Sequence, residues 1–241
     1  MTARITRIVL LLCLLSGICW AQTTYEKLVE ALKQDNPERA VTLSEMLEVE
    51  GRLSFGLFYN QGLAYRNQGQ NARARASFEQ ALLYEPRDLS TRRRLREVKE
   101  RLSPEIAQHD VTYTPWWSRT EAEAVLLAAG LVVLGLGLGR IIGKNISARQ
   151  VVASFAGFLV FAGLIVLTNP PAPRGVLVSS TVRLLNEPSG GATGPIVPEG
   201  VLVEVFGVKG HFIEVGTREG QRGWVRDAEI VLIGDEPQTR G

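Results

Sequence analysis

Two long apolar runs without a charged residue constrain this 241-residue chain more than any other feature. They are Ala124–Gly139, of sixteen residues, and Val151–Thr168, of eighteen. Because an α-helix rises 1.5 Å per residue, about 18–20 residues cross a hydrocarbon core of about 30 Å. The first run reaches that length at Gly143 when the Arg140 side chain extends to the interface. The sequence therefore predicts a hairpin of two transmembrane helices.

The charges around the two runs predict the orientation of the hairpin. Three cations and no acid occupy the segment between the runs: Arg140, Lys144 and Arg149. By contrast, Glu121 and Glu123 precede the first run. Because short basic loops stay in the cytoplasm, we expect both ends of the hairpin on the periplasmic side of a bacterial inner membrane. The alternative is a buried helical hairpin of a soluble domain, where two such runs are rare.

Small residues line one face of each apolar run. Gly135, Gly139 and Gly143 recur every four residues, and Ala153 and Gly157 give the second run a similar face. Such faces let membrane helices approach closely, so we expect them to pack the hairpin or to dock it on a partner. The alternative is that glycine is simply frequent in membrane helices.

The first 21 residues have the pattern of a secretory signal peptide. Arg4 and Arg7 precede the apolar stretch Ile8–Leu15, and small residues flank Trp20 before a cleavage point after Ala21. An uncleaved anchor is the alternative. Both cysteines of the chain, at positions 13 and 19, lie in this segment. The processed chain would therefore contain neither a disulfide nor a thiolate site.

Composition excludes several classes of function. A net charge of +2 is too small for electrostatic binding of nucleic acid. Two histidines and two cysteines make an all-protein zinc site improbable, because such a site needs about four ligands. Neither His109 nor His211 has a nearby serine or cysteine nucleophile in a catalytic pattern. We therefore predict a protein without enzymatic activity, metal or cofactor.

Residues 55–88 resemble a tetratricopeptide repeat. Seven positions match at the family's spacing: Phe58, Gly62, Tyr65, Ala74, Phe78, Ala81 and Pro86. Small residues let two antiparallel helices approach, aromatic residues fill the space between them, and proline ends the second helix. A weaker copy precedes this repeat, with Ala40 at the position of Ala74, and a charged helix over residues 91–102 would cap it. We therefore expect about two repeats and a cap.

The resemblance implies a concave face built from the first helix of each repeat. The matching residues are Tyr59, Asn60, Leu63, Arg66 and Asn67, with Arg93 and Arg96 beyond. This set could bind an extended peptide or an acidic tail, although Glu97 stands where a second cation would be wanted. The alternative is that the arginines only solvate a helix face.

The last block of the chain has short apolar runs between turn signals, which is typical of a small all-β barrel. It resembles bacterial SH3-like domains in Val182-Arg183, in Gly200, and above all in Gly223-Trp224-Val225. The resemblance implies a groove formed by Phe206, Phe212 and Trp224. The alternative is that these aromatic residues fill the core.

The predicted chain is a multidomain protein with nine segments. They are a signal peptide (1–21), a helical domain (22–102), a linker (103–123), a first transmembrane helix (124–143), a cytoplasmic loop (144–150), a second transmembrane helix (151–168), a Pro-rich linker (169–174), an SH3-like domain (175–234) and a tail (235–241). This order resembles the BatE-type proteins of aerotolerance operons. The resemblance implies von Willebrand-type membrane proteins and a MoxR-type ATPase as partners.

These features together predict a non-enzymatic, membrane-anchored scaffold. It would present protein-binding modules to the periplasm, in an envelope-stress or aerotolerance complex. The alternative is a peptidoglycan-binding module, or an accessory to cell-wall enzymes. Shared architecture is only associational evidence for either function.

Overall fold

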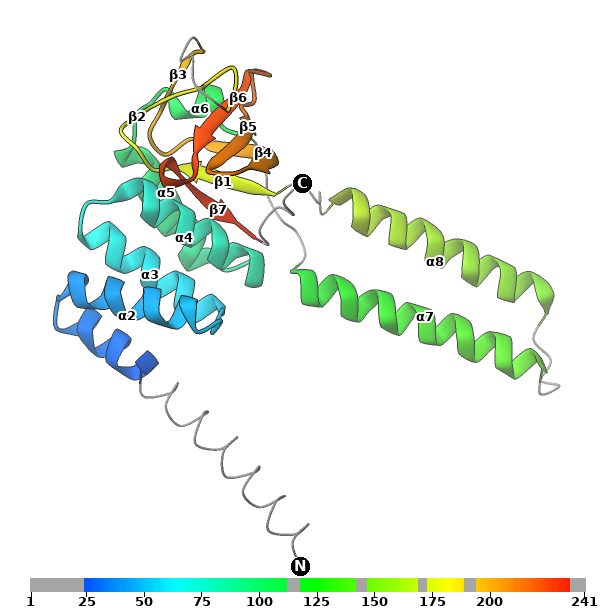
Figure 1. The fold of residues 1–241 in the computed structure, drawn as a ribbon. Coiled ribbons are helices and arrows are strands. Elements are labelled where there is room, and N and C mark those ends of the chain that lie inside the picture. Colours follow the sequence, from blue (N-terminus) through cyan, green and yellow to red (C-terminus); the bar gives the residue numbers. More distant parts are fainter. Residues whose placement is uncertain (1–23, 112–117, 142–146, 169–172, 189–193, 235–241) are drawn as a thin grey trace, which may run out of the picture.

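The computed structural model describes residues 24–111, 118–141, 147–168, 173–188 and 194–234. Within these ranges the chain combines α-helices with antiparallel β-sheet, which confirms the predicted mixture at that level (Figure 1). Several predicted features lie outside the described residues. They are the signal peptide (1–21), Gly143, residues 144–146 of the loop, residues 169–172 of the Pro-rich linker, and the tail (235–241).

The N-terminal part is a stack of antiparallel helices. Residues 24–33 are helical, and four helices follow: α2 (Pro37–Val49), α3 (Phe55–Asn67), α4 (Asn71–Tyr84) and α5 (Leu89–Arg101). Side-chain caps set three of the starts, because Asn36, Ser54 and Asp88 each accept a hydrogen bond from a backbone N–H in the first turn. The helix α4 begins 34 residues after α2, and α5 begins 34 residues after α3. This stack is called the helical module below.

A glycine sets the distance between α3 and α4. A Cβ added at Gly62 would lie 2.6 Å from Cε1 of Phe78, so only glycine lets the ring lie against the backbone of α3. Phe78 is fully buried in a cluster with Tyr65, Ala74 and Val98. This cluster joins α3, α4 and α5, and aromatic burial of this kind dominates the stability of small cores.

The C-terminal part, called the β module below, is a small antiparallel structure. A five-stranded sheet has the order β6-β5-β4-β1-β7, and β2 pairs with β3 beside it. The strands are β1 (Arg174–Leu177), β2 (Thr181–Arg183), β3 (Ile196–Pro198), β4 (Leu202–Lys209), β5 (Phe212–Gly216), β6 (Arg222–Arg226) and β7 (Ile230–Ile233), with the 3-10 turn η1 (Asp227–Glu229) before the last. Backbone hydrogen bonds between Leu185 and Trp224 join the smaller sheet to the larger one.

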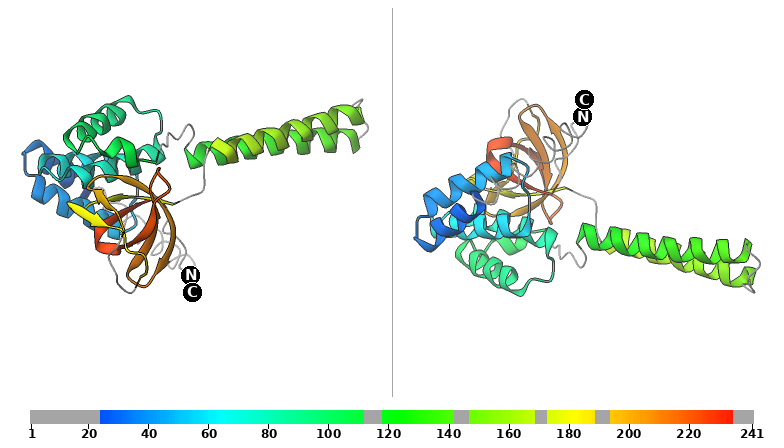
Figure 2. Two further views of the ribbon diagram at one scale, coloured as in Figure 1. Left: turned by 90° about the horizontal axis from the view of Figure 1, so that it is seen from above. Right: turned by 90° about the horizontal axis from the view of Figure 1, so that it is seen from below.

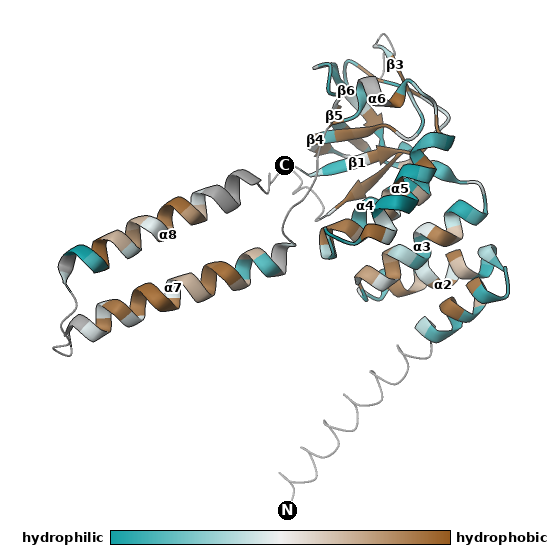
Figure 3. Cartoon of the chain, turned by 180° about the vertical axis from the view of Figure 1, so that it is seen from behind, coloured by the Kyte–Doolittle hydropathy of each residue, from teal (hydrophilic) through white to brown (hydrophobic). Residues whose placement is uncertain are grey.

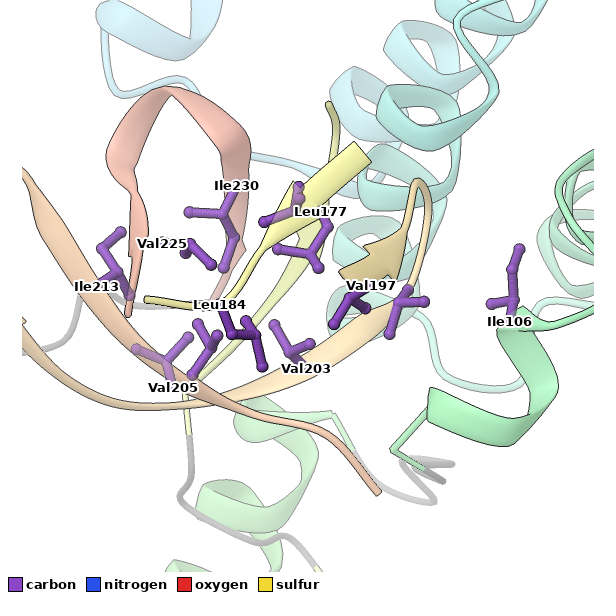
Figure 4. Packing of buried hydrophobic residues seen from close by; sticks show 12 residues of the cluster. Ile106, Leu177, Leu184, Val197, Val203, Val205, Ile213, Val225 and Ile230 are labelled. Atoms are coloured by element: carbon purple, nitrogen blue, oxygen red, sulfur yellow. The ribbon is translucent and has the colours of Figure 1, made fainter. Parts of the chain in front are cut away.

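Aliphatic side chains fill the interior of the β module (Figure 4). Leu177, Leu184 and Val203 are fully buried there, and Ile106 enters the same cluster from the short helix α6 (Ile106–His109). A bend at residues 179–180 separates β1 from β2.

The helical module and the β module share a buried interface. Ala72 and Ala76 of α4 pack with Val176, Leu202 and Ile233 of the sheet. The Nε2 atom of Gln80 also donates a hydrogen bond to the carbonyl of Leu232, at 3.0 Å. Figure 1 shows α4 lying along β1 and β7. The two modules therefore form one head.

The segment predicted as a linker, residues 103–123, contains helical residues in both of its described parts. Its first part contains α6, and the Val111 N–H donates to the carbonyl of Leu202 at 3.1 Å. Its last part, from Arg119, belongs to the next helix. In both of these described parts, backbone groups find partners in the sheet or in a helix.

Two long apolar helices leave the head side by side, α7 (Arg119–Ile141) and α8 (Ala148–Thr168) (Figures 1 and 2). Among the described residues, one helical stretch is long and apolar enough to cross a membrane, Glu121–Gly139 of α7. The apolar stretch Arg149–Gly163 of α8 is shorter. Only 6% of the α7 stretch is buried within the chain, although hydrophobic residues predominate along it (Figure 3).

Candidate functional site

The face formed by α3 and α5 contains most of the residues predicted for peptide binding. Tyr59 lies at its centre, with its ring 5.8 Å from that of Phe55 and 6.0 Å from that of Phe78. Its hydroxyl forms a hydrogen bond of 3.0 Å with the hydroxyl of Ser90, the second residue of α5. Leu63 packs at the edge of the same core cluster. An aromatic base with a polar tip therefore joins the two helices.

Glu97 organises the arginines of this face. Its carboxylate lies 3.1 Å from Nη1 of Arg94, 3.7 Å from Nη1 of Arg66 and 3.8 Å from Nε of Arg93. Arg66 also donates from Nη2 to the side-chain oxygen of Asn67, at 3.1 Å. The sequence did not single out Arg94, although its position three residues before Glu97 on one helix places the two side chains together. One carboxylate thus orients three guanidinium groups.

The electrostatics of this cluster favour a further anion. Burial lowers the pKa of Arg66, and repulsion from Arg94 and Arg101 adds to that effect, against the attraction of Glu97. The hydrogen bond from Arg94 lowers the pKa of Glu97, so its carboxylate is charged at neutral pH. Because several cations share one acid here, an added carboxylate would be attracted.

Two of the predicted residues have other partners or positions. The side-chain nitrogen of Asn60 donates to the hydroxyl of Tyr25 at 3.0 Å, so Asn60 is tied to the helix at residues 24–33. Arg96 is exposed on α5. The face can therefore present arginine groups from α3 and α5, and the amide of Asn67 from α3, beside an aromatic base. That is suited to a peptide carrying carboxylates.

The three aromatic residues predicted as an SH3-like groove lie on the outer side of the sheet. The core side of β5 is formed by Ile213 and Val215, so the alternating residues Phe212 and Gly216 face outward. Trp224 of β6 pairs with Glu214 of β5, which alternates with the core residues of that strand, so Trp224 is on the same outer side. These aromatic residues do not fill the core.

Phe206 has its own contacts on this outer side. A Cβ added at Gly216 would lie 2.7 Å from its ring, and the Arg222 guanidinium lies 4.1 Å from its centroid. This arrangement is a cation–π contact on a partly exposed aromatic residue. Phe206 is therefore held at the Gly216–Arg222 end of the sheet, whereas Phe212 pairs with Arg226 at the other end.

Three of the small residues predicted to pack the apolar helices are open. A Cβ added at Gly135 or Gly157 would meet no heavy atom within 4 Å, and Ala153 is exposed. Gly139 is buried, and Gly143 lies outside the described residues. Close packing of α7 on α8 therefore does not occur through Gly135 or Gly157, and these two positions remain accessible to another helix.

A buried ion pair joins the two modules, and the sequence did not reveal it. Arg75 of α4 is fully buried, and its guanidinium donates to both carboxylate oxygens of Asp110, at 2.9 and 2.6 Å. It also donates to the carbonyl of Gly200 at 2.5 Å. Asp110 accepts a further hydrogen bond of 2.9 Å from the N–H of Leu202, and Lys99 lies 3.0 Å away. Bidentate pairs of this kind fix geometry strongly.

Glu79 extends this network and gives it a dependence on pH. Burial raises the pKa of Glu79, although Arg75, Lys99 and Arg174 oppose the shift and Asp110 adds to it. A carboxyl whose pKa is raised by folding stabilises the fold when protonated, at low pH. That contribution is lost as the pH rises from the unfolded pKa, about 4.3, through the folded pKa.

We therefore expect the variant Glu79→Gln to be more stable relative to the parent at pH 7 than at pH 4.5. Unfolding midpoints of both proteins, measured across this pH range, test this expectation. The matched control is Glu85→Gln, at an exposed position just after α4. A difference in stability between Glu79→Gln and the parent that is the same at every pH would contradict a raised pKa of Glu79.

Within the described ranges, no group of three or more His, Cys, Asp or Glu side chains is placed to hold a metal ion. His211 lies 3.0 Å from Asp227, and His109 lies 3.6 Å from Glu219. Comparison of the chain with protein-family models, with curated proteins and with solved structures finds no match.

Proposed function

We propose that this chain is a non-enzymatic, membrane-anchored adaptor that binds an acidic segment of a partner protein. Its head would combine a tetratricopeptide-like helical module with an SH3-like β module. The apolar helices α7 and α8 would hold the head at the outer face of a bacterial inner membrane.

Two features of the helical module support the tetratricopeptide-like part of the proposal. The offset of 34 residues between successive helix pairs equals the length of that repeat. The close approach at Gly62, with Phe78 against it, is the packing that the repeat pattern requires. For the β module, support comes from the small five-stranded antiparallel sheet with an aliphatic core.

The observation that carries the anchoring proposal is the exposure of α7. Its apolar stretch of 19 residues is long enough for a hydrocarbon core, and almost none of it is covered by the chain. The neighbouring helix α8 returns the chain to the head (Figure 1). We propose that α8 is a second span, with the basic residues between the spans in the cytoplasm. Both modules then lie in the periplasm.

The class of partner follows from the face of α3 and α5. Arg66, Arg93 and Arg94 face a single carboxylate, that of Glu97, so the face can accept further negative charge. Membrane proteins of the von Willebrand type, working with a MoxR-type ATPase, are the partners that the resemblance suggests. The proposal here is limited to an acidic peptide segment of such a membrane protein.

Crosslinking on intact spheroplasts tests this function. A membrane-impermeant amine crosslinker reaches lysines of the head, such as Lys33 and Lys209, only if the head is periplasmic. We expect a defined crosslinked membrane protein with the parent chain. The double variant Arg66→Ala/Arg93→Ala should lose most of that product, because two of the charges beside Glu97 that would bind the acidic segment are removed.

The matched control is Arg39→Ala, which removes an exposed arginine from α2 rather than from α3 or α5. It should leave the product unchanged. Equal loss in both variants would contradict binding at the α3–α5 face. Crosslinking that occurs only after lysis of the spheroplasts would contradict the periplasmic orientation.

A further inference from the structure

Exposed apolar side chains of the helical module gather at one end. Outside α7 and α8, the large apolar residues exposed in the described part of the chain are Met46, Val49, Leu53, Tyr84, Leu89, Ile196 and Phe206. The first five belong to the helical module, where Val49 is 89% exposed and Leu89 is 79% exposed. A cluster of this kind on a folded surface usually marks an interaction site.

These five residues surround two neighbouring turns. The first turn, residues 50–54, joins the end of α2 to the start of α3. The second, residues 85–88, joins the end of α4 to the start of α5. The rings of Phe58 in α3 and Tyr84 in α4 lie 5.7 Å apart, and the hydroxyls of Tyr59 and Ser90 share a hydrogen bond. The two turns next to these residues therefore lie side by side.

The turns at the opposite end of the helical module provide a natural comparison. Residues 34–36 and 68–70 contain only polar residues and glycine, in the sequences Gln-Asp-Asn and Gln-Gly-Gln. Both ends are built from the same antiparallel helices, so the needs of helix capping and of solubility are the same at both. They do not explain why only one end exposes leucine and valine. We call residues 46–54 and 84–89 the apolar end of the head.

The apolar end lies beside the start of α7. Arg87, in the second turn, forms an ion pair with Glu121, the first residue of the stretch that is long enough to span a membrane. The chain also returns from α8 to this side of the head. It enters β1 at Arg174, which pairs with Ile233 of β7, and the next residue, Gly234, lies against Leu83 of α4. Figure 1 shows the α4–α5 connection on the side of the head from which the long helices leave.

The β module contributes an aromatic residue to the same side. The Val205 N–H donates to the carbonyl of Pro173, where the chain returns from α8, and Phe206 is the next residue of β4. Phe206 is 37% exposed with Arg222 over its ring. Among the seven exposed apolar residues of the described ranges, Ile196 on β3 does not belong to this side of the head.

We propose that the apolar end of the head inserts into the interface of the bilayer that α7 crosses, so that the head rests on the membrane. This inference depends on the proposed anchoring of α7. Leucine, valine and tyrosine side chains enter the boundary between headgroups and acyl chains. In this arrangement the exposed Arg52 and Arg87 of the two turns would lie at the level of the lipid phosphates.

Apolar insertion, rather than net charge, is the basis of this contact. The two turns carry Arg52 and Arg87, but also Glu50, Glu85 and Asp88. The surface is therefore not basic, and attraction to anionic lipids would be weak. The contact should consequently persist in zwitterionic lipid and at high salt.

Depth-dependent fluorescence quenching tests this proposal on the full chain. Cys13 and Cys19 are first replaced by serine, and single cysteines are then placed at Leu53, Leu89, Gln70 or Leu131 for labelling with a small fluorophore. The labelled proteins are reconstituted in phosphatidylcholine nanodiscs that contain a lipid with a doxyl group near the headgroup, or deep in the acyl chain. Gln70 is an exposed control in the opposite turns, and Leu131 is an exposed position of α7.

The shallow quencher should reduce the fluorescence of labels at Leu53 and Leu89, but not of the label at Gln70. This result should be the same in low salt and in 0.5 M KCl, a concentration of order ten times that at which attraction between surface charges is strong. The label at Leu131 should respond to the deep quencher. The substitutions Val49→Glu and Leu89→Glu should abolish quenching at Leu53, whereas Ile196→Glu should leave it unchanged. Each of these three positions is exposed, so the fold should tolerate the new carboxylate.

The outcomes separate this proposal from the anchoring of α7. Quenching at Leu131 without quenching at Leu53 and Leu89 means that α7 is inserted and the head is held away from the bilayer, which overturns the present inference alone. The absence of quenching at Leu131 overturns the anchoring. Quenching at Gln70 equal to that at Leu53 and Leu89 shows non-specific lipid contact, and also overturns the inference.

Discussion

The substitution Asp110→Asn is expected to lower the free energy of unfolding of the head by about 3–5 kcal/mol, the usual effect of removing one partner of a buried ion pair. The substitution keeps the shape of the side chain, but it leaves the buried Arg75 guanidinium without its bidentate carboxylate. Because this pair joins α4 to the strand that begins at Leu202, contact between the modules should weaken. Denaturant unfolding of the full chain in detergent, followed by circular dichroism, measures the effect.

Two further variants make this prediction specific. Arg93→Ala removes an exposed arginine that lies 3.8 Å from Glu97, and it should change stability by no more than about 1 kcal/mol. Arg75→Met should be as harmful as Asp110→Asn, and the double variant should lose less than the sum of the two single changes. A loss below about 1 kcal/mol for Asp110→Asn would show that the ion pair does not hold the modules together.

The substitution Phe78→Ala should have an effect of similar size, about 3–5 kcal/mol, because it leaves a cavity in the helical core. The ring is fully buried between α3, α4 and α5, against Gly62 and beside Tyr59. The helices can close this gap only partly, since their backbones are already in close approach at Gly62. Thermal unfolding in detergent should show a clearly lowered midpoint.

The control for this prediction is Ile196→Ala, which shortens an apolar side chain that is half exposed. Its effect should be well below that of Phe78→Ala, because little buried area is lost. The change Gly62→Ala gives an independent measure, since the added methyl group would lie within 3 Å of the Phe78 ring. It should destabilise the parent protein but cost less when residue 78 is leucine. Equal costs in both backgrounds would contradict the close contact.

Local patterns predicted the helices better than the relation between the modules. The contact between Gly62 and Phe78 joins neighbouring helices, and its residue types and spacing are readable from the sequence. The bond from Arg75 to Gly200 spans 125 positions, and no local periodicity indicates it. Asp110 stands among polar residues after a charged helix, so it was assigned to a linker. Only the folded arrangement of α4 against the sheet shows that it is buried.

The candidate site was predictable in part, for a similar reason. The resemblance to a tetratricopeptide repeat implied a face that includes Tyr59, Leu63 and Arg66, and their spacing of three and four residues is that of one helix face. It could not show that Asn60 turns to Tyr25, a contact that depends on how the first helix packs. In the sheet, the sequence left open whether Phe212 and Trp224 fill the core. Strand register decides this, since a shift of one residue would exchange the two sides.

The interface between the two modules can form only late in the synthesis of the chain. Arg75 and the alanines of α4 are synthesised before α7 and α8, whereas the sheet that covers them begins only at Arg174. At the usual rates of translation, roughly 5–20 residues per second, the docking face of α4 waits several seconds for its partner. During that interval a buried cation and an apolar surface are exposed to solvent. The apolar hairpin must therefore leave the ribosome, and find its own environment, before the head can close.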